Sequence, residues 1–406
     1  MEAIIQPKDV SDKVREILKT ANMNACLTCG TCVAGCPSSG IDEMDPRQVY
    51  RMLAYGLEQE VVASRWPWVC TGCLRCNREC PMGVDMAPIQ KTLKAMRARE
   101  DVPGSLHKGA VTCVEKGNHI GVPQGDYLWL LEDSAEELDQ AEGLTGIKVP
   151  VDKEGANYLF FPNSKEVFGE PDDMKWWWKI FYAAKEDWTV PSENWDSYNW
   201  GFFTANDELH KAIVTHQVDN MYKLKAKTMI LPDCGGGSLA CRMGIHKWFP
   251  EALNDWNYVY LYDVLKKYLE EGRIKIDKSR HPQLVTYHDS CSHGRKIEMS
   301  FGRGYYEEPR WIVNQCCENF VEMHPNRSNS YCCGAGAGMW AGPYKDAAKY
   351  HGRRKAESIR NSGAEMVIVS CSNCRDMIMK ALTKEYDLDI EVKYLWQLVA
   401  DSLILE

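Results

Sequence analysis

The sequence lacks the features that mark a membrane-spanning, exported or nucleic-acid-binding protein. No stretch of the 406 residues approaches about 18 uninterrupted apolar residues, so we expect no transmembrane helix. The opening residues, MEAIIQPKDV, are polar and turn acidic within ten positions, which does not fit an export signal. The net charge is −9 with no block of like charge, which argues against nucleic acid as a partner. We therefore expect a cytoplasmic protein that reaches the cytoplasmic face of a membrane only through a partner.

Cysteine, by contrast, is abundant. Eighteen Cys in a chain without an expected export signal argue for metal binding rather than disulfides. Two runs, CLTCGTCVAGCP at 26–37 and CTGCLRCNRECP at 70–81, share the spacing Cys-x2-Cys-x2-Cys-x3-Cys-Pro. In the bacterial ferredoxin signature the fourth Cys of each run ligates the other cluster. We therefore predict one [4Fe–4S] cluster on Cys26, Cys29, Cys32 and Cys80, and a second on Cys70, Cys73, Cys76 and Cys36. Zinc is the alternative, but it favours two pairs of ligands around a tetrahedron.

Helical patterns surround these two loops. Apolar residues recur at helix spacing over 8–20, Asp45-Pro46 predicts the start of a helix over 47–59, and Ala87-Pro88 leads into another over 89–99. The long insert between the loops resembles the helical ferredoxin module of the succinate dehydrogenase type. That resemblance implies a module that moves electrons one at a time and has no chemistry of its own.

The rest of the chain contains a hidden repeat over 156–240 and 283–380. The strand-like runs NYLFFPNS (157–164) and TMILPDCGGG (228–237) correspond to LVTYHDSC (284–291) and MVIVSCSNC (366–374). In this alignment Ser164 takes the place of Cys291, Cys234 that of Cys371 and Gly237 that of Cys374, while NWGFF (199–203) falls near Cys333-Gly334. Helical stretches at 208–225 and 346–363 alternate with the strands, which predicts two α/β lobes with parallel sheets. Ligands in such folds gather at the C-terminal ends of strands, where these Cys lie.

The second copy reads Cys-x40-Cys-Cys-Gly-x36-Cys-x2-Cys and resembles the CCG domain of the heterodisulfide reductase family. The resemblance implies an unusual, non-cubane iron–sulfur cluster that cleaves a disulfide, held by Cys291, Cys332, Cys333, Cys371 and Cys374. The alternatives are zinc, an ordinary cubane or a vestigial site. The first copy retains only Cys234, so we expect no full cluster there and leave open whether Cys234 binds metal.

The fusion of both parts resembles the D-subunit type of heterodisulfide reductase and DsrK-type iron–sulfur proteins. Segments such as GNHIGVPQ (117–124), HDSCSHGR (288–295) and YCCGAGAGMWAG (331–342) carry this resemblance over nearly the whole chain. It implies an α+β protein: a two-cluster ferredoxin domain (1–105), a first α/β lobe with a degenerate CCG site (106–270) and a second α/β lobe with the complete site (271–406). It also implies partners, namely other redox subunits such as a membrane cytochrome b-type or quinol-linked subunit, and a small sulfur-carrier protein as substrate.

Cleavage of a disulfide takes two electrons, whereas cubanes deliver one at a time, so a special third cluster after two ordinary ones makes chemical sense. His288 and His293 flank Cys291 and are candidates to give the leaving thiolate a proton. The alternative is that they only hydrogen-bond backbone near the cluster. For Arg295 we weigh charge balance or an anionic substrate group against a surface salt bridge. The glycines of GAGAG (334–338) are interpreted as room for the cluster.

Four Cys have no predicted place in these clusters. For Cys113, and for Cys316 and Cys317 on an expected helix over 311–320, we favour core packing. Cys241 has no assigned role. The leading hypothesis is a catalytic subunit that reduces a disulfide or a sulfur-carrier persulfide or trisulfide. The runner-up is a pure electron relay of a larger complex, of the membrane cytochrome or benzoyl-CoA reductase type, with no disulfide chemistry.

Overall fold

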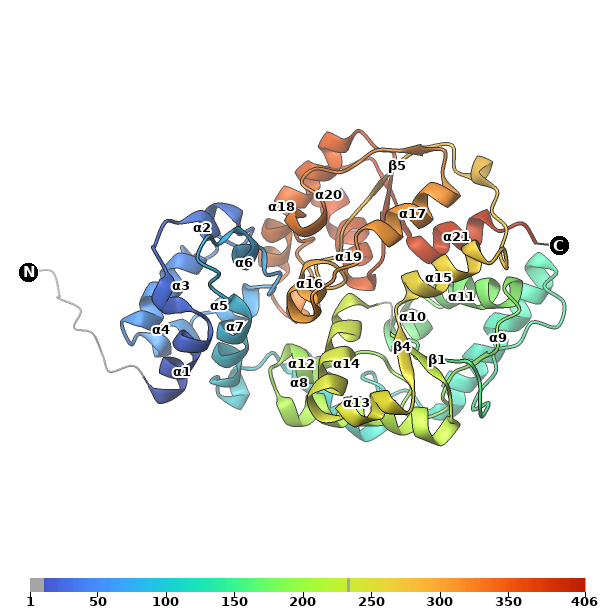
Figure 1. The fold of residues 1–406 in the computed structure, drawn as a ribbon, viewed down its shortest axis with the longest axis horizontal. Coiled ribbons are helices and arrows are strands. Elements are labelled where there is room, and N and C mark those ends of the chain that lie inside the picture. Colours follow the sequence, from blue (N-terminus) through green and yellow to red (C-terminus); the bar gives the residue numbers. More distant parts are fainter. Residues whose placement is uncertain (1–10, 232–233, 406) are drawn as a thin grey trace, which may run out of the picture.

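The molecule consists of an N-terminal helical module beside two stacked α/β lobes (Figure 1). The structure is a computed structural model that describes residues 11–231 and 234–405. Each lobe has a four-stranded sheet in which every strand pair is parallel. The predicted fold class, a helical module followed by two repeated α/β lobes, is therefore confirmed.

Short helices hold the two Cys-rich loops of the N-terminal module. They are α1 (Asp12–Thr20), α2 (Thr31–Gly35), α3 (Pro46–Ala54), α4 (Glu58–Ala63), α5 (Trp66–Val69), α6 (Arg75–Glu79) and α7 (Met86–Ala95). Asp45 caps α3 by accepting a hydrogen bond from the Gln48 amide at 2.8 Å. The prediction that this helix continues to residue 59 is wrong, because Gly56 adopts a φ of 72° and α4 begins separately. Residues 8–10 of the first predicted helix lie outside the described residues.

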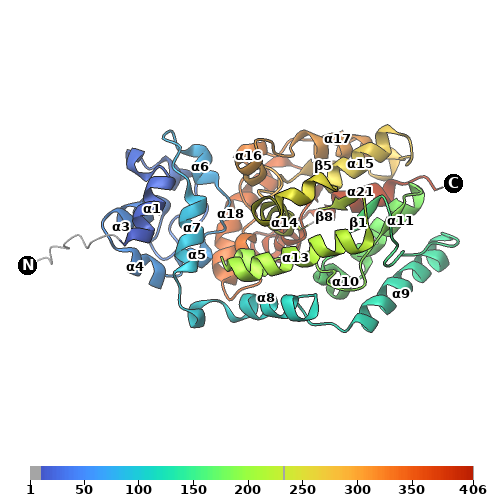
Figure 2. The same cartoon turned by 60° about the horizontal axis from the view of Figure 1, so that its bottom comes forward.

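Two long helices connect the module to the lobes. α8 (Gly104–Lys116) and α9 (Gln124–Glu142) run along one side of the molecule, from the module to the far end (Figure 2). Within the described ranges, no helix is long and apolar enough to cross a membrane.

The first lobe has the strand order β2-β1-β3-β4. Its strands are β1 (Tyr158–Phe160), β2 (Trp188–Thr189), β3 (Thr228–Ile230) and β4 (Asn257–Val259), and its helices are α10 (Ser164–Gly169), α11 (Asp172–Ala183), α12 (Trp200–Phe203), α13 (Asp207–Leu224), α14 (Gly235–Trp248) and α15 (Leu261–Glu270). β1 and β3 coincide with the strand-like runs read from the sequence. Residues 200–203, aligned with the CCG doublet, instead form the short helix α12.

The second lobe repeats this topology with the order β6-β5-β7-β8. Its strands are β5 (Leu284–Tyr287), β6 (Asn319–Phe320), β7 (Met366–Val369) and β8 (Glu391–Tyr394), and its helices are α16 (Arg295–Phe301), α17 (Glu307–Cys316), α18 (Lys345–Ser362), α19 (Ser372–Asp376), α20 (Thr383–Glu385) and α21 (Leu395–Ser402). A π-helical segment, Met377–Leu382, joins α19 to α20. The helix expected over 311–320 ends at Cys316, because Asn319 and Phe320 pair with β5.

The two lobes are held together by helices of one lobe that pack on helices of the other. α21 of the second lobe packs on α11 of the first, and α17 packs on α15. Trp177 and Trp396 are both at most 1% exposed, and their ring centroids lie 5.9 Å apart. The strand ends that carry the Cys of both lobes are therefore held in a fixed relation.

Candidate functional site

The eight Cys of the N-terminal module line two small cavities. Cys26, Cys29, Cys32 and Cys80 line one, and Cys36, Cys70, Cys73 and Cys76 line the other. This is the same crossed grouping that the spacing predicts, and it arises because α2 and α6, which precede the fourth Cys of each run, pack on one another. Cys29 of the first set is exposed, whereas the three Cys of the second run in the other set are buried. The first set therefore lies nearer to solvent.

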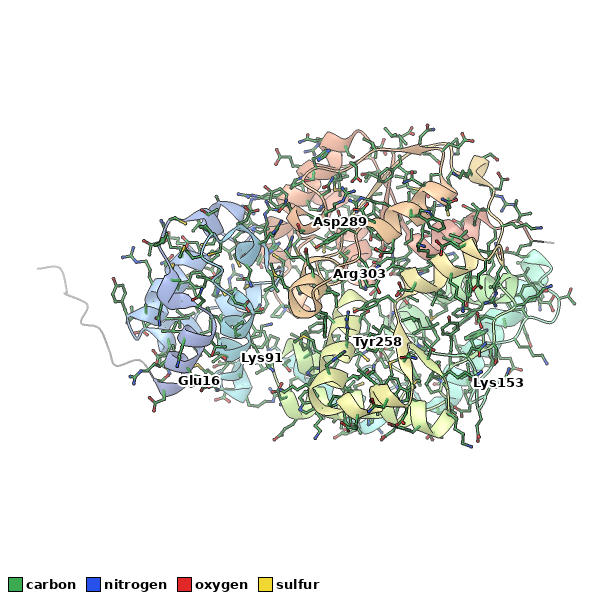
Figure 3. All side chains as sticks on the ribbon, viewed as in Figure 1. Glu16, Lys91, Lys153, Tyr258, Asp289 and Arg303 are labelled. Atoms are coloured by element: carbon green, nitrogen blue, oxygen red, sulfur yellow. The ribbon has the colours of Figure 1, made fainter. Side chains whose placement is uncertain are left out.

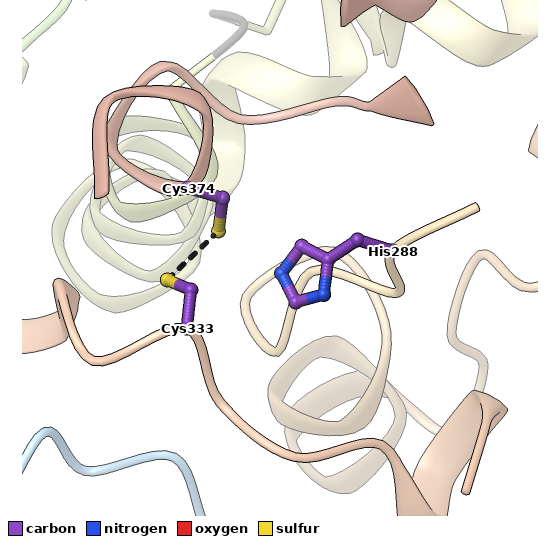
Figure 4. Close-up of side chains that lie close together, drawn as sticks. All are labelled: His288, Cys333 and Cys374. Atoms are coloured by element: carbon purple, nitrogen blue, oxygen red, sulfur yellow. Dashed lines mark hydrogen bonds between the residues drawn. The ribbon is translucent and has the colours of Figure 1, made fainter. Parts of the chain in front are cut away.

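The five Cys of the CCG pattern meet at the C-terminal ends of β5 and β7. Cys291 follows β5, Cys371 and Cys374 stand at the start of α19, and Cys332 and Cys333 come from the loop before α18. The Cys333 and Cys374 sulfurs lie 3.3 Å apart (Figure 4). Electrostatic interactions also join Cys332 to Cys291 and Cys371 to Cys374. All five thiols thus form one connected group.

Interactions between these thiols favour the thiolate at Cys291, Cys333 and Cys371. A hydrogen bond from Cys332 lowers the pKa of Cys291 and, together with one from Cys374, holds the pKa of Cys333 well below its usual value. The pKa of Cys371 is held well below its usual value by hydrogen bonds with Cys234 and Cys374. The same interactions raise the pKa of Cys332 and Cys374 well above its usual value. Three of the five thiols are thus disposed to the thiolate, which is the form that binds metal.

His288 faces this group directly. It is 1% exposed, and one of its ring nitrogens lies within 4.8 Å of the Cys333 and Cys374 sulfurs (Figure 4). Among the described residues neither ring nitrogen has a partner in hydrogen-bond geometry. The donor set of buried thiols with an imidazole beside them fits a metal–sulfur centre. The same His and two Cys would also suit zinc, so the metal content decides between the two.

His293 is placed differently. Its Nδ1 lies 3.0 Å from the Tyr262 hydroxyl and its Nε2 3.4 Å from the Ser238 hydroxyl, both in the first lobe. Burial lowers the pKa of His293 to about 4, so the ring is neutral at ordinary pH. The side chain therefore links the two lobes.

The glycines after the Cys doublet allow close backbone contacts. The Gly334 amide donates to the Cys332 sulfur at 3.4 Å, and a Cβ at Gly334 would lie 2.3 Å from the Ala348 carbonyl oxygen. A Cβ at Gly336 would lie 2.9 Å from the carbonyl oxygen of Thr71, in the ferredoxin module. Gly336 thus makes room for the neighbouring module.

The ferredoxin module meets the CCG group at Cys73. Interaction with the Cys332 thiol holds the pKa of the Cys73 thiol well below its usual value. Arg295 fixes this junction, since its Nε donates to the Cys73 carbonyl at 2.7 Å and its Nη1 donates to the Ser330 carbonyl at 3.1 Å. The alternative of a surface salt bridge for Arg295 is wrong, because the residue is 1% exposed and bonds carbonyl groups.

Comparison with known proteins matches both parts of the chain. Residues 22–84 match the family described as 4Fe-4S dicluster domain, and residues 285–379 match the family described as Cysteine-rich domain, or CCG. The chain is similar to an Hdr-like menaquinol oxidoreductase iron-sulfur subunit 2 of Archaeoglobus fulgidus, with 24% identity over 94% of this chain and 80% of the relative. It is also 24% identical to the D subunit of the dihydromethanophenazine:CoB--CoM heterodisulfide reductase of Methanosarcina acetivorans, over 94% of each chain.

A shorter relative has a higher sequence identity over the part of the chain that it matches. The C subunit of the H(2):CoB-CoM heterodisulfide,ferredoxin reductase of Methanothermobacter marburgensis is 30% identical over 35% of this chain and 75% of the relative. The chain belongs to the heterodisulfide reductase family of iron–sulfur proteins. It is accordingly a redox protein with more than one iron–sulfur cluster, and its role is electron transfer.

In this member of the heterodisulfide reductase family the first lobe has a polar network where the second has thiols. Ser164, at the position of Cys291, donates to Asp196 at 2.5 Å, and His119 Nδ1 lies 2.6 Å from the same carboxylate. Trp200 stacks on His119 with ring centroids 4.8 Å apart. The network fills the degenerate site with hydrogen bonds and aromatic packing.

Cys234, the thiol left from the first copy, points to the second lobe. It hydrogen-bonds Cys371 and accepts from Asn373 Nδ2 at 3.4 Å. The alignment of Cys234 with Cys371 between the two copies indicates this contact, because equivalent strand ends face each other across the lobe boundary. The four other Cys, namely Cys113, Cys241, Cys316 and Cys317, are buried at 0–3% exposure in the core.

Proposed function

We propose that the chain passes electrons through two [4Fe–4S] clusters to a third, CCG-bound cluster that reduces a disulfide or a sulfur-carrier persulfide or trisulfide. The first cluster is held by Cys26, Cys29, Cys32 and Cys80, the second by Cys70, Cys73, Cys76 and Cys36, and the third by Cys291, Cys332, Cys333, Cys371 and Cys374. We assign the electron-transfer path to residues 1–105 and the reacting site to the lobes at 106–270 and 271–406.

The observation that carries this proposal is the junction between Cys73 and Cys332. The Cys73 thiol of the second cavity interacts with the Cys332 thiol of the CCG group, and Arg295, four residues after Cys291, bonds the Cys73 carbonyl, so the two sets lie next to one another. The first cavity has the exposed Cys29 and is the natural entry for electrons from a partner. The order of the sets from solvent inward thus matches the order expected of a conducting path.

The reaction is R–S–S–R′ + 2 e⁻ + 2 H⁺ → RSH + R′SH, with two electrons supplied singly by a redox partner. When bound, a cluster at the CCG group supplies iron that can hold one substrate sulfur. A cavity of about 590 Å³ opens onto Cys291, Cys333 and Cys371 and gives a substrate access to them. A ring nitrogen of His288 lies within 4.8 Å of the Cys333 and Cys374 sulfurs, which suits this side chain to pass a proton to the departing sulfur.

The cavity extends past the CCG thiols to Asp85 and Lys91 of the ferredoxin module, and this extent favours the catalytic hypothesis over a pure relay. The named relatives suggest the partners. The A. fulgidus relative is a menaquinol oxidoreductase subunit, and a 23% identical relative from Syntrophomonas wolfei, matched over 44% of its length, is an EtfAB:quinone oxidoreductase. We propose a quinol-linked, membrane cytochrome b-type partner at the cytoplasmic face of the membrane.

Iron analysis and electron paramagnetic resonance (EPR) of the anaerobically purified protein test the proposal. Three four-iron clusters need about twelve irons per chain, so a value near eight, or stoichiometric zinc, would refute it. We expect an oxidised paramagnetic signal that changes on adding a thiol and disappears in Cys333→Ser. The control is Cys241→Ser, whose buried thiol lies 3.7 Å from the Met229 sulfur and is expected to leave that signal intact.

A further inference from the structure

Lys355 is a fully buried cation that the proposed chemistry does not use. It lies on α18 and is 0% exposed, and its Nζ donates to the Ser330 hydroxyl at 3.0 Å and lies 3.2 Å from the Met323 sulfur. Within residues 11–231 and 234–405 its ammonium group forms no ion pair with an acidic side chain. A buried charge is unfavourable unless a group of opposite charge compensates it. The burial of Lys355 therefore indicates a negative group nearby.

The helix that carries Lys355 packs directly against the Cys doublet. A Cβ at Gly352 would lie 2.7 Å from the Cys333 carbonyl oxygen, so α18 leaves no space there for a side chain. Lys355 follows Gly352 by three residues and therefore lies on the same face of the helix. The negative charges of the Cys333, Cys374 and Cys332 thiolates act on its ammonium group. The CCG group is thus the negative neighbour of Lys355.

The acid near Lys355 is already paired. Asp289 (Figure 3) also acts on the ammonium group, but its carboxylate forms a bidentate pair with Arg310 at N–O distances of 2.7 and 2.9 Å. Burial lowers the pKa of Lys355 to about 8, and the negative charges of Asp289 and Cys333 oppose this lowering. Because this pKa lies above neutral pH, the side chain keeps its positive charge in the folded protein.

The other basic side chains near the CCG group act elsewhere. The charges of Lys296 and Arg295 act on Cys291. His351, one turn before Lys355 on α18, points to the ferredoxin module, where its Nε2 lies 3.1 Å from the Thr71 hydroxyl. Burial lowers the pKa of His351, so its ring is neutral. Among the buried side chains of α18, Lys355 is therefore the one that brings a charge to the CCG group.

We propose that Lys355 is a positioning residue whose charge stabilises the reduced form of the centre at the CCG group and so raises its reduction potential. The proposal rests on the proposed function, because it needs a cluster held by these thiols. Each electron that arrives from the redox partner adds one negative charge to a site that is largely closed to water, and a neighbouring cation offsets that charge. No proton moves in this step, since Lys355 stays protonated throughout. The lysine thereby favours the arrival of electrons at the end of the path.

An anaerobic redox titration followed by EPR tests the proposal. Lys355→Met and Lys355→Gln both remove the charge. At the midpoint potential of the wild-type third cluster we expect the ratio of reduced to oxidised cluster to fall by about tenfold or more in both variants, and a factor of ten equals about 59 mV for a one-electron couple. Lys355→Arg keeps the charge and should stay within about threefold of the wild-type ratio.

Two controls separate the charge from its surroundings. Ser330→Ala removes the hydrogen-bond partner of Lys355 but leaves the charge in place. Lys349→Met removes another cation of α18, which is 41% exposed and already paired with Glu385. Each control should leave the ratio of reduced to oxidised third cluster within about threefold of the wild-type value.

The outcomes distinguish this proposal from the proposed function. An unchanged ratio in both neutral Lys355 variants, with about twelve irons per chain, would overturn the proposal and leave the proposed function standing. Loss of the third-cluster signal from both variants would show a purely structural role and would overturn it as well. If the ratio falls as expected, yet the wild-type protein reduces no disulfide with reduced methyl viologen as donor, the role of Lys355 stands and the proposed function fails.

Discussion

The buried ion pair behind the CCG loop gives a prediction with a defined magnitude. Arg310 forms a bidentate pair with Asp289, with N–O distances of 2.7 and 2.9 Å, and both residues are 4% exposed. Asp289 stands two residues before Cys291 (Figure 3) and also accepts from the Arg327 amide at 2.7 Å. Burial opposes the charge of Arg310, but the hydrogen bonds with Asp289 and Glu322 outweigh it and raise the pKa of the guanidinium.

Arg310→Met leaves the Asp289 carboxylate buried without its cation. Breaking a buried pair in this way costs about 3–5 kcal/mol, because the remaining charge is neither hydrated nor compensated. The matched control is Lys349→Met, which removes a pair with Glu385 at 2.8 Å whose side chains are 41% and 42% exposed. An exposed pair of this kind contributes at most about 1 kcal/mol.

The assay is anaerobic guanidinium unfolding, followed by loss of the visible cluster absorbance. We expect a clearly lower midpoint for Arg310→Met and nearly the wild-type midpoint for Lys349→Met. The double variant Arg310→Met/Asp289→Leu should recover much of the loss, since it removes the orphaned charge as well. Equal midpoints for Arg310→Met and Lys349→Met would refute the reasoning, as would a double variant that is less stable than the single one.

Three further predictions concern the path and its end. Cys29→Ser should stop turnover with the natural donor while the EPR signal of the third cluster persists. Simultaneous loss of turnover and of this signal would contradict the separation of the electron-transfer path from the reacting site. Gly336→Val should slow electron passage from the second to the third cluster in stopped-flow reduction, with iron content near wild type, because its side chain collides with the Thr71 carbonyl at the junction; an unchanged rate would count against that junction. Cys234→Ser should keep about twelve irons per chain, since the first lobe is expected to hold no cluster of its own, and a drop by about four would show otherwise.

The sequence predicts the scaffold well because its signals are local. Cys spacing groups the two ferredoxin sets, and apolar runs that end in Cys or Ser locate β1, β3, β5 and β7. The four edge strands β2, β4, β6 and β8 are not among the predicted strands, and β2 and β6 are only two residues long. The helix from Asp45 was extended too far because the positive φ of Gly56 interrupts an apolar periodicity that otherwise continues.

Contacts between distant segments could not be predicted. Nothing near Cys73 indicates that its thiol meets Cys332, since that meeting depends on how the module docks on the lobes. Lys296 lies next to Arg295 in the sequence, yet one faces a cavity and the other bonds the Cys73 loop. In the sequence Lys94 resembles a surface lysine of an amphipathic helix. In the structure it is buried and donates a hydrogen bond to the Phe203 carbonyl. The spacing of Cys in the sequence predicts the candidate ligands, whereas tertiary packing determines which side chains lie around them.

The interlocking of α11 with α21 has a consequence for biogenesis. Trp177 completes its packing only against Trp396, which lies 219 residues later in the chain. The interior of the first lobe therefore stays incomplete during synthesis until the segment with Trp396 has been made, and Cys371 and Cys374 are made shortly before that segment. We accordingly expect iron to reach the proposed third centre only after residue 396 has been made, whereas the two centres proposed in the ferredoxin module can be filled earlier.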